Sequence, residues 1–218
     1  MTTVALIDYG AGNLVSIGQA LELLGAEVRL CRRPDELEGV DAVVVPGVGA
    51  SGPAMTRLRR QGLDRAISDA VAGGAWYLGI CLGLQLLFER SEEDGAQMLG
   101  LLPGKVALIP DAPKLPHIGW NGLEPIGEHP LLAGIATGTP AYFVHSYVAV
   151  PDDRRSVVAE TVHGGRFASA IAADHLLGVQ FHPERSGTDG LRILANAIAL
   201  FEGRATATTP GASLAAVL

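Results

Sequence analysis

A cysteine set between two glycines is the first feature of this sequence that could do chemistry. Residues 79–83, GICLG, lie where an apolar run of strand length meets a helical pattern. This is the spacing of a nucleophile elbow, in which a tight turn exposes Cys81 and the glycines remove Cβ atoms that would clash. The following helix would favour thiolate, and its first amides, beginning with Leu82, could bind an oxyanion. Since free cysteines are often buried, the pentapeptide alone also fits a structural cysteine.

A histidine and a glutamate two residues apart could supply the matching base. His182 and Glu184 follow an apolar run, and Pro183 between them disfavours helix at His182. In an extended chain the two side chains would point to the same side. Glu184 could then accept one imidazole N–H and fix the tautomer whose other nitrogen takes the thiol proton. Such a pair alone is more often structural, but with the cysteine turn it predicts a Cys-His-Glu triad.

A glycine-rich segment follows another predicted strand. Residues 47–52, GVGASG, match G-x-G-x-x-G, so a dinucleotide site has to be weighed. The segment does not open the first strand-helix unit, and Pro46 precedes it. We therefore favour a mobile loop in which Gly47, Val48 and Gly49 offer a backbone N–H to an oxyanion, and we expect no cofactor.

The other histidines show no metal-binding spacing. They are His117, His129, His145, His163 and His175. None forms an H-E-x-x-H or similar pattern, so we expect no metal. His145 differs from the rest because it adjoins Ser146 and Tyr147 at the end of an apolar strand, where the amino-acid backbone of a ligand could dock.

The elements that must position these residues alternate along the chain. Strands are expected at 4–7, 41–45, 75–79, 142–150, 156–160, 166–172 and 177–181, and helices at 14–24, up to 71, after 81 and at 191–201. Pro46 should end its strand, because proline cannot donate to the ladder. The Pro- and Gly-rich region 95–138 should form loops with short strands. This order predicts an α/β fold of three layers, with a mostly parallel sheet and helices on both faces.

Composition predicts one folded domain and a tail. The 218 residues are 48% hydrophobic and 18% charged, which suffices for one core at 1–202. Residues 203–218 have one charge and no apolar face, so we expect a disordered tail. A net charge of −7 and only a short basic cluster, Arg29, Arg32 and Arg33, argue against nucleic acid as a partner.

The chain shows no sign of membrane insertion or export. No run of eighteen apolar residues occurs, and the N-terminus lacks a basic signal region. Its two cysteines, Cys31 and Cys81, form neither a disulfide framework nor a zinc motif. We expect a cytoplasmic protein.

At this point two motifs resemble those of the class I glutamine amidotransferases. GICLGLQ and FHPE, about one hundred residues apart, place Cys81, His182 and Glu184 at the family's triad. Three further stretches look like the glutaminase subunits of imidazole glycerol phosphate synthases: IDYGAGNL at 7–14, PGVGA at 46–50 and KLPHIGWN at 114–121. The resemblance covers about residues 4–202. Its departures, Ile118 where methionine is frequent and Arg185 where lysine also occurs, do not touch the triad.

The resemblance implies a flavodoxin-like fold and a specific reaction. Glutamine would be hydrolysed through a γ-glutamyl thioester at Cys81. Ammonia would pass to a (β/α)₈ barrel cyclase subunit in a heterodimer, which makes imidazole glycerol phosphate and aminoimidazole carboxamide ribonucleotide in histidine biosynthesis. Positions that match glutamine-binding ones are Gly49, Gln85, Glu93, Ser146 and Tyr147. Positions that match the partner interface are Tyr9, Asn13, Trp120, Asn121 and Arg185.

Two other readings remain open. The chain could be a glutaminase that serves a different synthase, such as the one for pyridoxal phosphate, although KLPHIGWN argues against it. It could also be a binding subunit that has kept the fold and lost turnover, which the complete set of Cys81, His182 and Glu184 disfavours.

Overall fold

The computed structural model describes residues 1–203, so the predicted tail, apart from Gly203, lies outside the described residues. The helices are α1 (Leu14–Leu23), α2 (Ser51–Gln61), α3 (Leu63–Ala72), α4 (Leu82–Leu86) and α5 (Gly187–Phe201), with 3-10 turns η1 (Pro34–Leu37), η2 (Pro130–Leu132), η3 (Arg154–Ser156) and η4 (Pro183–Arg185). The strands are β1 (Thr3–Ile7), β2 (Glu27–Cys31), β3 (Ala42–Gly47), β4 (Trp76–Cys81), β5 (Arg90–Ser91), β6 (Gly104–Leu108), β7 (His117–Pro125), β8 (Thr139–His145), β9 (Tyr147–Pro151), β10 (Val157–His163), β11 (Gly165–Ala173) and β12 (Leu176–Val179).

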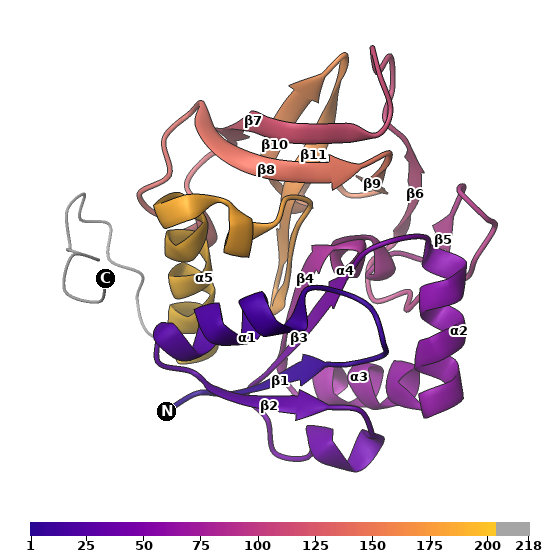
Figure 1. The fold of residues 1–218 in the computed structure, drawn as a ribbon, viewed down its shortest axis with the longest axis vertical. Coiled ribbons are helices and arrows are strands. Elements are labelled where there is room, and N and C mark those ends of the chain that lie inside the picture. Colours follow the sequence, from indigo (N-terminus) through magenta and orange to yellow (C-terminus); the bar gives the residue numbers. More distant parts are fainter. Residues whose placement is uncertain (204–218) are drawn as a thin grey trace.

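The strands form one large mixed sheet and one small sheet (Figure 1). The large sheet has the order β2-β1-β3-β4-β12-β11-β10-β7-β8. Strands β2, β1, β3, β4 and β12 run parallel, and from β12 onward each neighbour is antiparallel. Strands β5, β6 and β9 make the small sheet. The α/β fold is confirmed, and the antiparallel half extends it beyond the parallel strands that the sequence pattern predicts.

Helices cover both faces of the parallel half because its strands are apolar on both sides. In β1, Val4 and Leu6 pack into the cluster that contains α1 and α5, whereas Ala5 and Ile7 pack into the cluster that contains α2 and α3. This alternation is the period of two expected of a strand, and each fully buried aliphatic side chain contributes roughly 1.5–3 kcal/mol. The two cores hold the carboxyl ends of β3 and β4 in fixed positions.

Three differences from the sequence prediction have a visible cause in the structure; in addition, strand β2 was not predicted, and other strand ends move by a few residues. Strand β3 continues through Pro46 to Gly47, because its pairing with β1 ends at Val44 and only β4 lies beside it from there. The predicted helix up to residue 71 is two helices separated by Gly62, whose φ is +71°. The predicted strand 142–150 is interrupted at Ser146, so that β8 belongs to the large sheet and β9 to the small one.

The region 95–138 is also more ordered than its composition indicates. It contains β6 and the nine-residue strand β7, which pairs with β8 along seven residues from His117 to Leu123. None of the helices in the described part of the chain is long and apolar enough to cross a membrane.

Candidate active site

Cys81 lies in a strained turn at the carboxyl end of β4. Its φ of 55° and ψ of −108° are unusual for a residue with a side chain. A Cβ on Gly79 would lie 2.4 Å from the Gly83 backbone, and a Cβ on Gly83 would lie 1.7 Å from the Val45 carbonyl oxygen. Both glycines are therefore needed for close packing, as the sequence pattern predicts. The helix predicted after Cys81 is α4, which has five residues.

His182 and Glu184 form a buried pair. Glu184 Oε1 accepts a hydrogen bond from His182 Nδ1 at 3.0 Å, and the Glu184 side chain has no exposed surface. His182 is extended, as expected, but Glu184 lies in the η4 turn rather than in an extended chain. Pro183 begins this turn, and its fixed φ suits the first position of a helical turn. The contact therefore arises through a turn of the backbone.

The electrostatics of His182 depend on its two neighbours. Burial lowers the pKa of His182, but its interactions with Cys81 and Glu184 outweigh burial and raise the pKa to about 10. Among the described residues Nε2 has no hydrogen-bond partner of ordinary geometry. The imidazole is therefore close enough to Cys81 for the two groups to interact, but its Nε2 is not aligned for a hydrogen bond to the sulfur. Such loose alignment is common in sites without substrate.

A cavity of about 300 Å³ opens beside Cys81. It is lined by Gly49, Ala50, Cys81, Leu82, Gln85, Glu93, Pro116, Val144, His145, Ser146 and Tyr147. All five residues predicted to hold glutamine therefore share one cavity with the cysteine, and His145 joins them. Burial raises the pKa of Glu93, the nearby Asp94 adds to the shift, and a backbone hydrogen bond from Ser51 opposes it. His182 and Glu184 do not line the cavity.

The residues predicted to stabilise an oxyanion take different positions. Gly49, with φ of +91°, and Leu82 both line the cavity. Gly47 instead ends β3, pairs with Cys81 and packs so closely that an added Cβ would lie 2.2 Å from the Tyr9 hydroxyl. Val48 is 47% exposed and outside the cavity lining. Gly49 and Leu82 are thus the candidates with direct access to a ligand.

The predicted partner-facing residues do not all reach the surface. Trp120 is 58% exposed, Arg185 is exposed, and Asn13 and Asn121 are half-buried. Tyr9 is a correction, because it is buried and its hydroxyl donates to the Pro46 carbonyl at 3.0 Å. In this chain Tyr9 supports the strand that carries the glycine loop and does not offer a surface to a partner.

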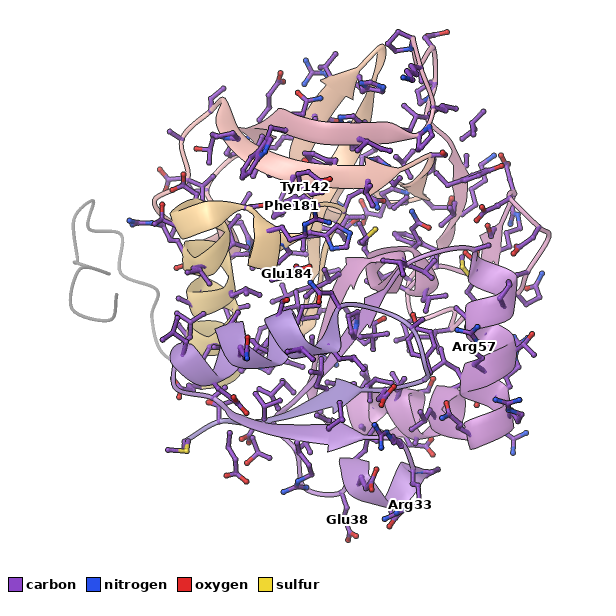
Figure 2. All side chains as sticks on the ribbon, in the orientation of Figure 1. Arg33, Glu38, Arg57, Tyr142, Phe181 and Glu184 are labelled. Atoms are coloured by element: carbon purple, nitrogen blue, oxygen red, sulfur yellow. The ribbon has the colours of Figure 1, made fainter. Side chains whose placement is uncertain are left out.

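Tyr142 is a residue that the sequence analysis missed. The Arg185 guanidinium lies 4.0 Å from the centre of the Tyr142 ring, and Trp120 meets the same ring edge-on at 6.0 Å. The Tyr142 carbonyl accepts a hydrogen bond from the His182 N–H at 2.9 Å. Figure 2 labels Tyr142 on β8, with Phe181 and Glu184 below it on the segment that leads into α5. Tyr142 thus links two surface residues to the backbone of the histidine.

Three of the histidines form a cluster beside the cavity. His145 Nδ1 bonds the Tyr147 carbonyl at 3.1 Å, His117 Nδ1 lies 3.2 Å from His145 Nε2, and His163 stacks on His117. Burial lowers the pKa of His117 to about 4 and that of His145 to about 3, with neighbouring histidines adding to both shifts. His117 and His145 are therefore expected to be neutral at pH 7. Within residues 1–203 no group of three or more His, Cys, Asp or Glu side chains is placed to hold a metal.

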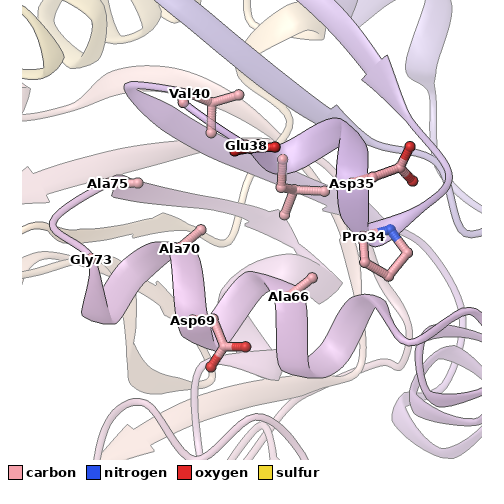
Figure 3. Close-up of a pocket in the computed structure, with 11 residues that line it drawn as sticks. Pro34, Asp35, Glu38, Val40, Ala66, Asp69, Ala70, Gly73 and Ala75 are labelled. Carbon is pink, nitrogen blue, oxygen red and sulfur yellow. The ribbon is translucent and has the colours of Figure 1, made fainter.

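A larger hollow of about 580 Å³ lies between η1 and α3 (Figure 3). Its lining includes the carboxylates Asp35, Glu38 and Asp69, but neither a cysteine nor a histidine. Asp35 is already paired with Arg33. Of these two cavities, only the smaller one is lined by a cysteine and a histidine. We therefore assign the candidate active site to the smaller cavity.

The sequence matches a known family and several close relatives. The family model of glutamine amidotransferase class-I matches residues 5–200. "Imidazole glycerol phosphate synthase subunit HisH" of Symbiobacterium thermophilum is 46% identical over 197 residues, which are 90% of this chain and 93% of that protein. The protein of the same description from a Synechococcus species is 49% identical over 197 residues, 88% and 90% of the two chains.

Solved structures agree with the fold. "Structure of PurLQS from Thermotoga maritima" superposes with a TM-score of 0.73 at 20% identity and covers 91% of this chain and 98% of that one. "Crystal structure of glutamine amidotransferase" gives a TM-score of 0.71 at 23% identity, covering 89% and 98%. At these identities the likeness concerns the fold alone. Taken with the family model and the relatives, it follows that the chain belongs to the class I glutamine amidotransferases, among the HisH subunits of imidazole glycerol phosphate synthase.

Proposed function

We propose that this chain hydrolyses glutamine at Cys81 and delivers the ammonia to a (β/α)₈ barrel cyclase with which it forms a heterodimer in the cytoplasm. The observation that carries the proposal is the placement of Cys81. It lies at a positive-φ turn on the wall of a 300 Å³ cavity, with the buried pair of His182 and Glu184 beside it. The 46% identity to a HisH subunit supports the choice of synthase.

In the first half of the reaction the Cys81 thiolate attacks the side-chain amide carbon of glutamine. The carbonyl π electrons move to oxygen, where the N–H groups of Gly49 and Leu82 are the proposed donors. His182 carries the proton taken from the thiol and gives it to the leaving nitrogen as the C–N bond breaks. Ammonia leaves and a γ-glutamyl thioester remains on sulfur.

In the second half water hydrolyses the thioester. His182 takes a proton from water as the new C–O bond forms, and the C–S bond breaks with its electrons returning to sulfur. Glutamate leaves, and the sulfur and imidazole return to their starting state. Glu184 changes neither its bonds nor its protonation in this scheme. It orients the ring and favours the imidazolium, as the orienting carboxylate of a triad does.

The cavity offers polar groups that suit the amino-acid end of glutamine. Glu93 places a carboxylate in the cavity, which would attract an α-ammonium group. Ser146 and Tyr147 lie at the junction of β8 and β9, where the chain leaves the large sheet for the small one. We assign the binding of glutamine to these residues together with Gln85 and Gly49.

The surface near the active site suits a protein partner. Ile118 is 60% exposed and Trp120 is 58% exposed on β7, and large exposed apolar side chains close together are typical of interfaces. Through Tyr142, Trp120 and Arg185 connect this surface to His182. A partner that rearranges these contacts could gate turnover, and a rotation of the peptide at Gly49 could supply or remove an oxyanion donor.

The test compares glutamine and ammonia as nitrogen sources. Cys81→Ala should abolish glutamine-dependent synthesis by the complex and leave ammonia-dependent synthesis intact, because the thiol acts only on glutamine. Glutaminase activity that persists in pure Cys81→Ala protein would rule out Cys81 as the nucleophile.

A second experiment tests the choice of partner. Glutamate release should rise when the cyclase and its phosphoribulosyl-formimino ribonucleotide are added to the wild-type chain. If a pyridoxal phosphate synthase subunit stimulated the chain instead, the assignment to imidazole glycerol phosphate synthase would be wrong. A chain that binds glutamine but never releases glutamate would be a binding subunit.

A further inference from the structure

The sulfur of Cys81 has a polar neighbour that the triad does not include. Gln180 Nε2 lies 3.7 Å from Cys81 Sγ, within hydrogen-bond range for sulfur, and Gln180 is completely buried. Its backbone N–H donates to the Ser169 carbonyl at 2.9 Å, which ties this residue to β11. Gln180 also precedes His182 by two residues, so one short segment presents both side chains to the cysteine.

The hydrogen bonds of Gln85 decide which end of the Gln180 amide faces sulfur. The carbonyl oxygen of Tyr147 can only accept, so the Gln85 group that lies 2.8 Å from it must be the NH₂. The same NH₂ lies 3.2 Å from Gln180 Oε1, and it has a second N–H to donate. The oxygen of Gln180 therefore faces Gln85, and its N–H faces Cys81. A backbone carbonyl thus fixes the orientation of both amide groups.

The Tyr147 carbonyl is itself held in place. His145 Nδ1 lies 3.1 Å from it and must be the donor, since a carbonyl cannot donate. His145 Nε2 is then the acceptor for His117 Nδ1 at 3.2 Å, and His117 Nε2 is the acceptor for the Asn121 amide at 3.3 Å. Each ring has one donor and one acceptor, as neutral imidazoles require. The donor and the acceptor of every hydrogen bond in this series, from Asn121 to Gln180, are therefore determined.

We propose that Gln180 is a catalytic residue whose side-chain N–H stabilises the Cys81 thiolate, and that Gln85 orients it. The inference rests on the proposed function, in which Cys81 is the nucleophile. An N–H aimed at a charged acceptor forms a stronger bond than one aimed at a neutral acceptor. The donor therefore favours thiolate before attack, and it favours the C–S cleavage that returns the electron pair to sulfur. It acts least on the neutral thioester between these steps.

Gln180→Met is the main test, because methionine has a similar length but no N–H. The readout is the pH dependence of Cys81 alkylation by iodoacetamide in the full chain, followed by peptide mass spectrometry with Cys31 as an internal reference. Losing a hydrogen bond to a charged acceptor should raise the midpoint of this dependence by about one to two pH units. His182 and Tyr9 both interact electrostatically with Cys81, and both are unchanged in the variant.

Turnover in the complex with the cyclase gives the second readout. Gln180→Met should reduce kcat about ten- to a hundredfold at neutral pH, with KM for glutamine changed by less than about threefold. Ser169→Ala is the matched control. Ser169 is a fully buried neighbour whose hydroxyl has no hydrogen-bond partner among residues 1–203, and its carbonyl remains to hold Gln180. This control should keep both the alkylation midpoint and kcat.

A second variant keeps the proposal testable if Gln180→Met does not fold. Gln85→Met leaves Gln180 in place but removes the group that orients it, so the alkylation midpoint should move in the same direction by a smaller amount. Unchanged midpoints in folded variants, even with reduced kcat, would overturn the role of Gln180 and leave Cys81 as the nucleophile. Activity in Cys81→Ala would instead overturn the proposed function itself.

Discussion

The charge on Glu184 can be tested by replacing it with glutamine. The Glu184 side chain has no exposed surface, and its Oε1 accepts from His182 Nδ1 at 3.0 Å. Glutamine has the same shape and can still accept through its amide oxygen, but it lacks the negative charge. A hydrogen bond to a charged group is worth roughly 1.5–3 kcal/mol, against roughly 0.5–1.5 kcal/mol between neutral groups. The difference of about 1–1.5 kcal/mol corresponds to about a five- to tenfold lower kcat.

The variant should also change the pH dependence in a defined direction. Burial lowers the pKa of His182, but its interactions with Cys81 and Glu184 raise it to about 10. Because this folded-state pKa lies above the ordinary value near 6.5, the stabilisation is fully present below about pH 6.5 and is lost as the pH rises through about 10. Without the carboxylate the imidazolium is less favoured. The alkaline limit of kcat and the alkaline loss of stability should both move to lower pH.

The assay is glutaminase activity of the complex at saturating glutamine, between about pH 6 and about pH 10. Urea unfolding over the same range reports stability. In the part of the chain that the structure describes, Glu184 Oε2 has no hydrogen-bond partner. An amide at position 184 would place a buried N–H there, which costs roughly 1–3 kcal/mol of stability. Glu27→Gln, on the exposed surface of β2, is the control. A folded Glu184→Gln protein with the wild-type pH profile would refute the proposed role of the charge.

Three further changes test other parts of the site. Gly83→Ala places a Cβ 1.7 Å from the Val45 carbonyl oxygen, so it should lower the free energy of unfolding by at least about 1–3 kcal/mol and reduce activity, as urea titration and glutamate release would show. Tyr9→Phe leaves the buried Pro46 carbonyl without its donor and should cost roughly 1–3 kcal/mol in the same titration. Trp120→Ala should reduce the cyclase-stimulated rate and leave the basal rate nearly unchanged; equal losses in both rates would contradict an interface role.

Local signals explain what could be predicted from the sequence. The turn at Cys81 depends on Gly79 and Gly83, which are close neighbours in the chain, and the structure shows why neither tolerates a Cβ. The strands of the parallel half are apolar on both faces, which gives continuous apolar runs such as the one in β3. His182 and Glu184 are two residues apart, so their contact could be anticipated even though the backbone makes it through a 3-10 turn.

Long-range pairing explains what could not be predicted. Ser146 separates two strands that join different sheets, and nothing in the apolar run around it marks the change of partner. Tyr9 belongs to a polar motif, yet it is buried because β3 and the glycine loop close over its hydroxyl. Gln180 stands in an apolar run, where only the alternation with His182 hints at a position beside the cysteine. Contacts between distant segments decide all three positions.

The γ-glutamyl thioester on Cys81 is the most direct test of the proposed chemistry. The complex with the cyclase would be mixed with glutamine and the ribonucleotide, quenched in acid within the first turnover, digested and examined by mass spectrometry. We predict a glutamyl adduct on the peptide that contains Cys81, none on the peptide that contains Cys31, and slower disappearance of the adduct in His182→Ala. Glutamate release from a wild-type complex whose Cys81 never carries the adduct, under quench conditions that preserve a thioester standard, would contradict nucleophilic catalysis by this residue.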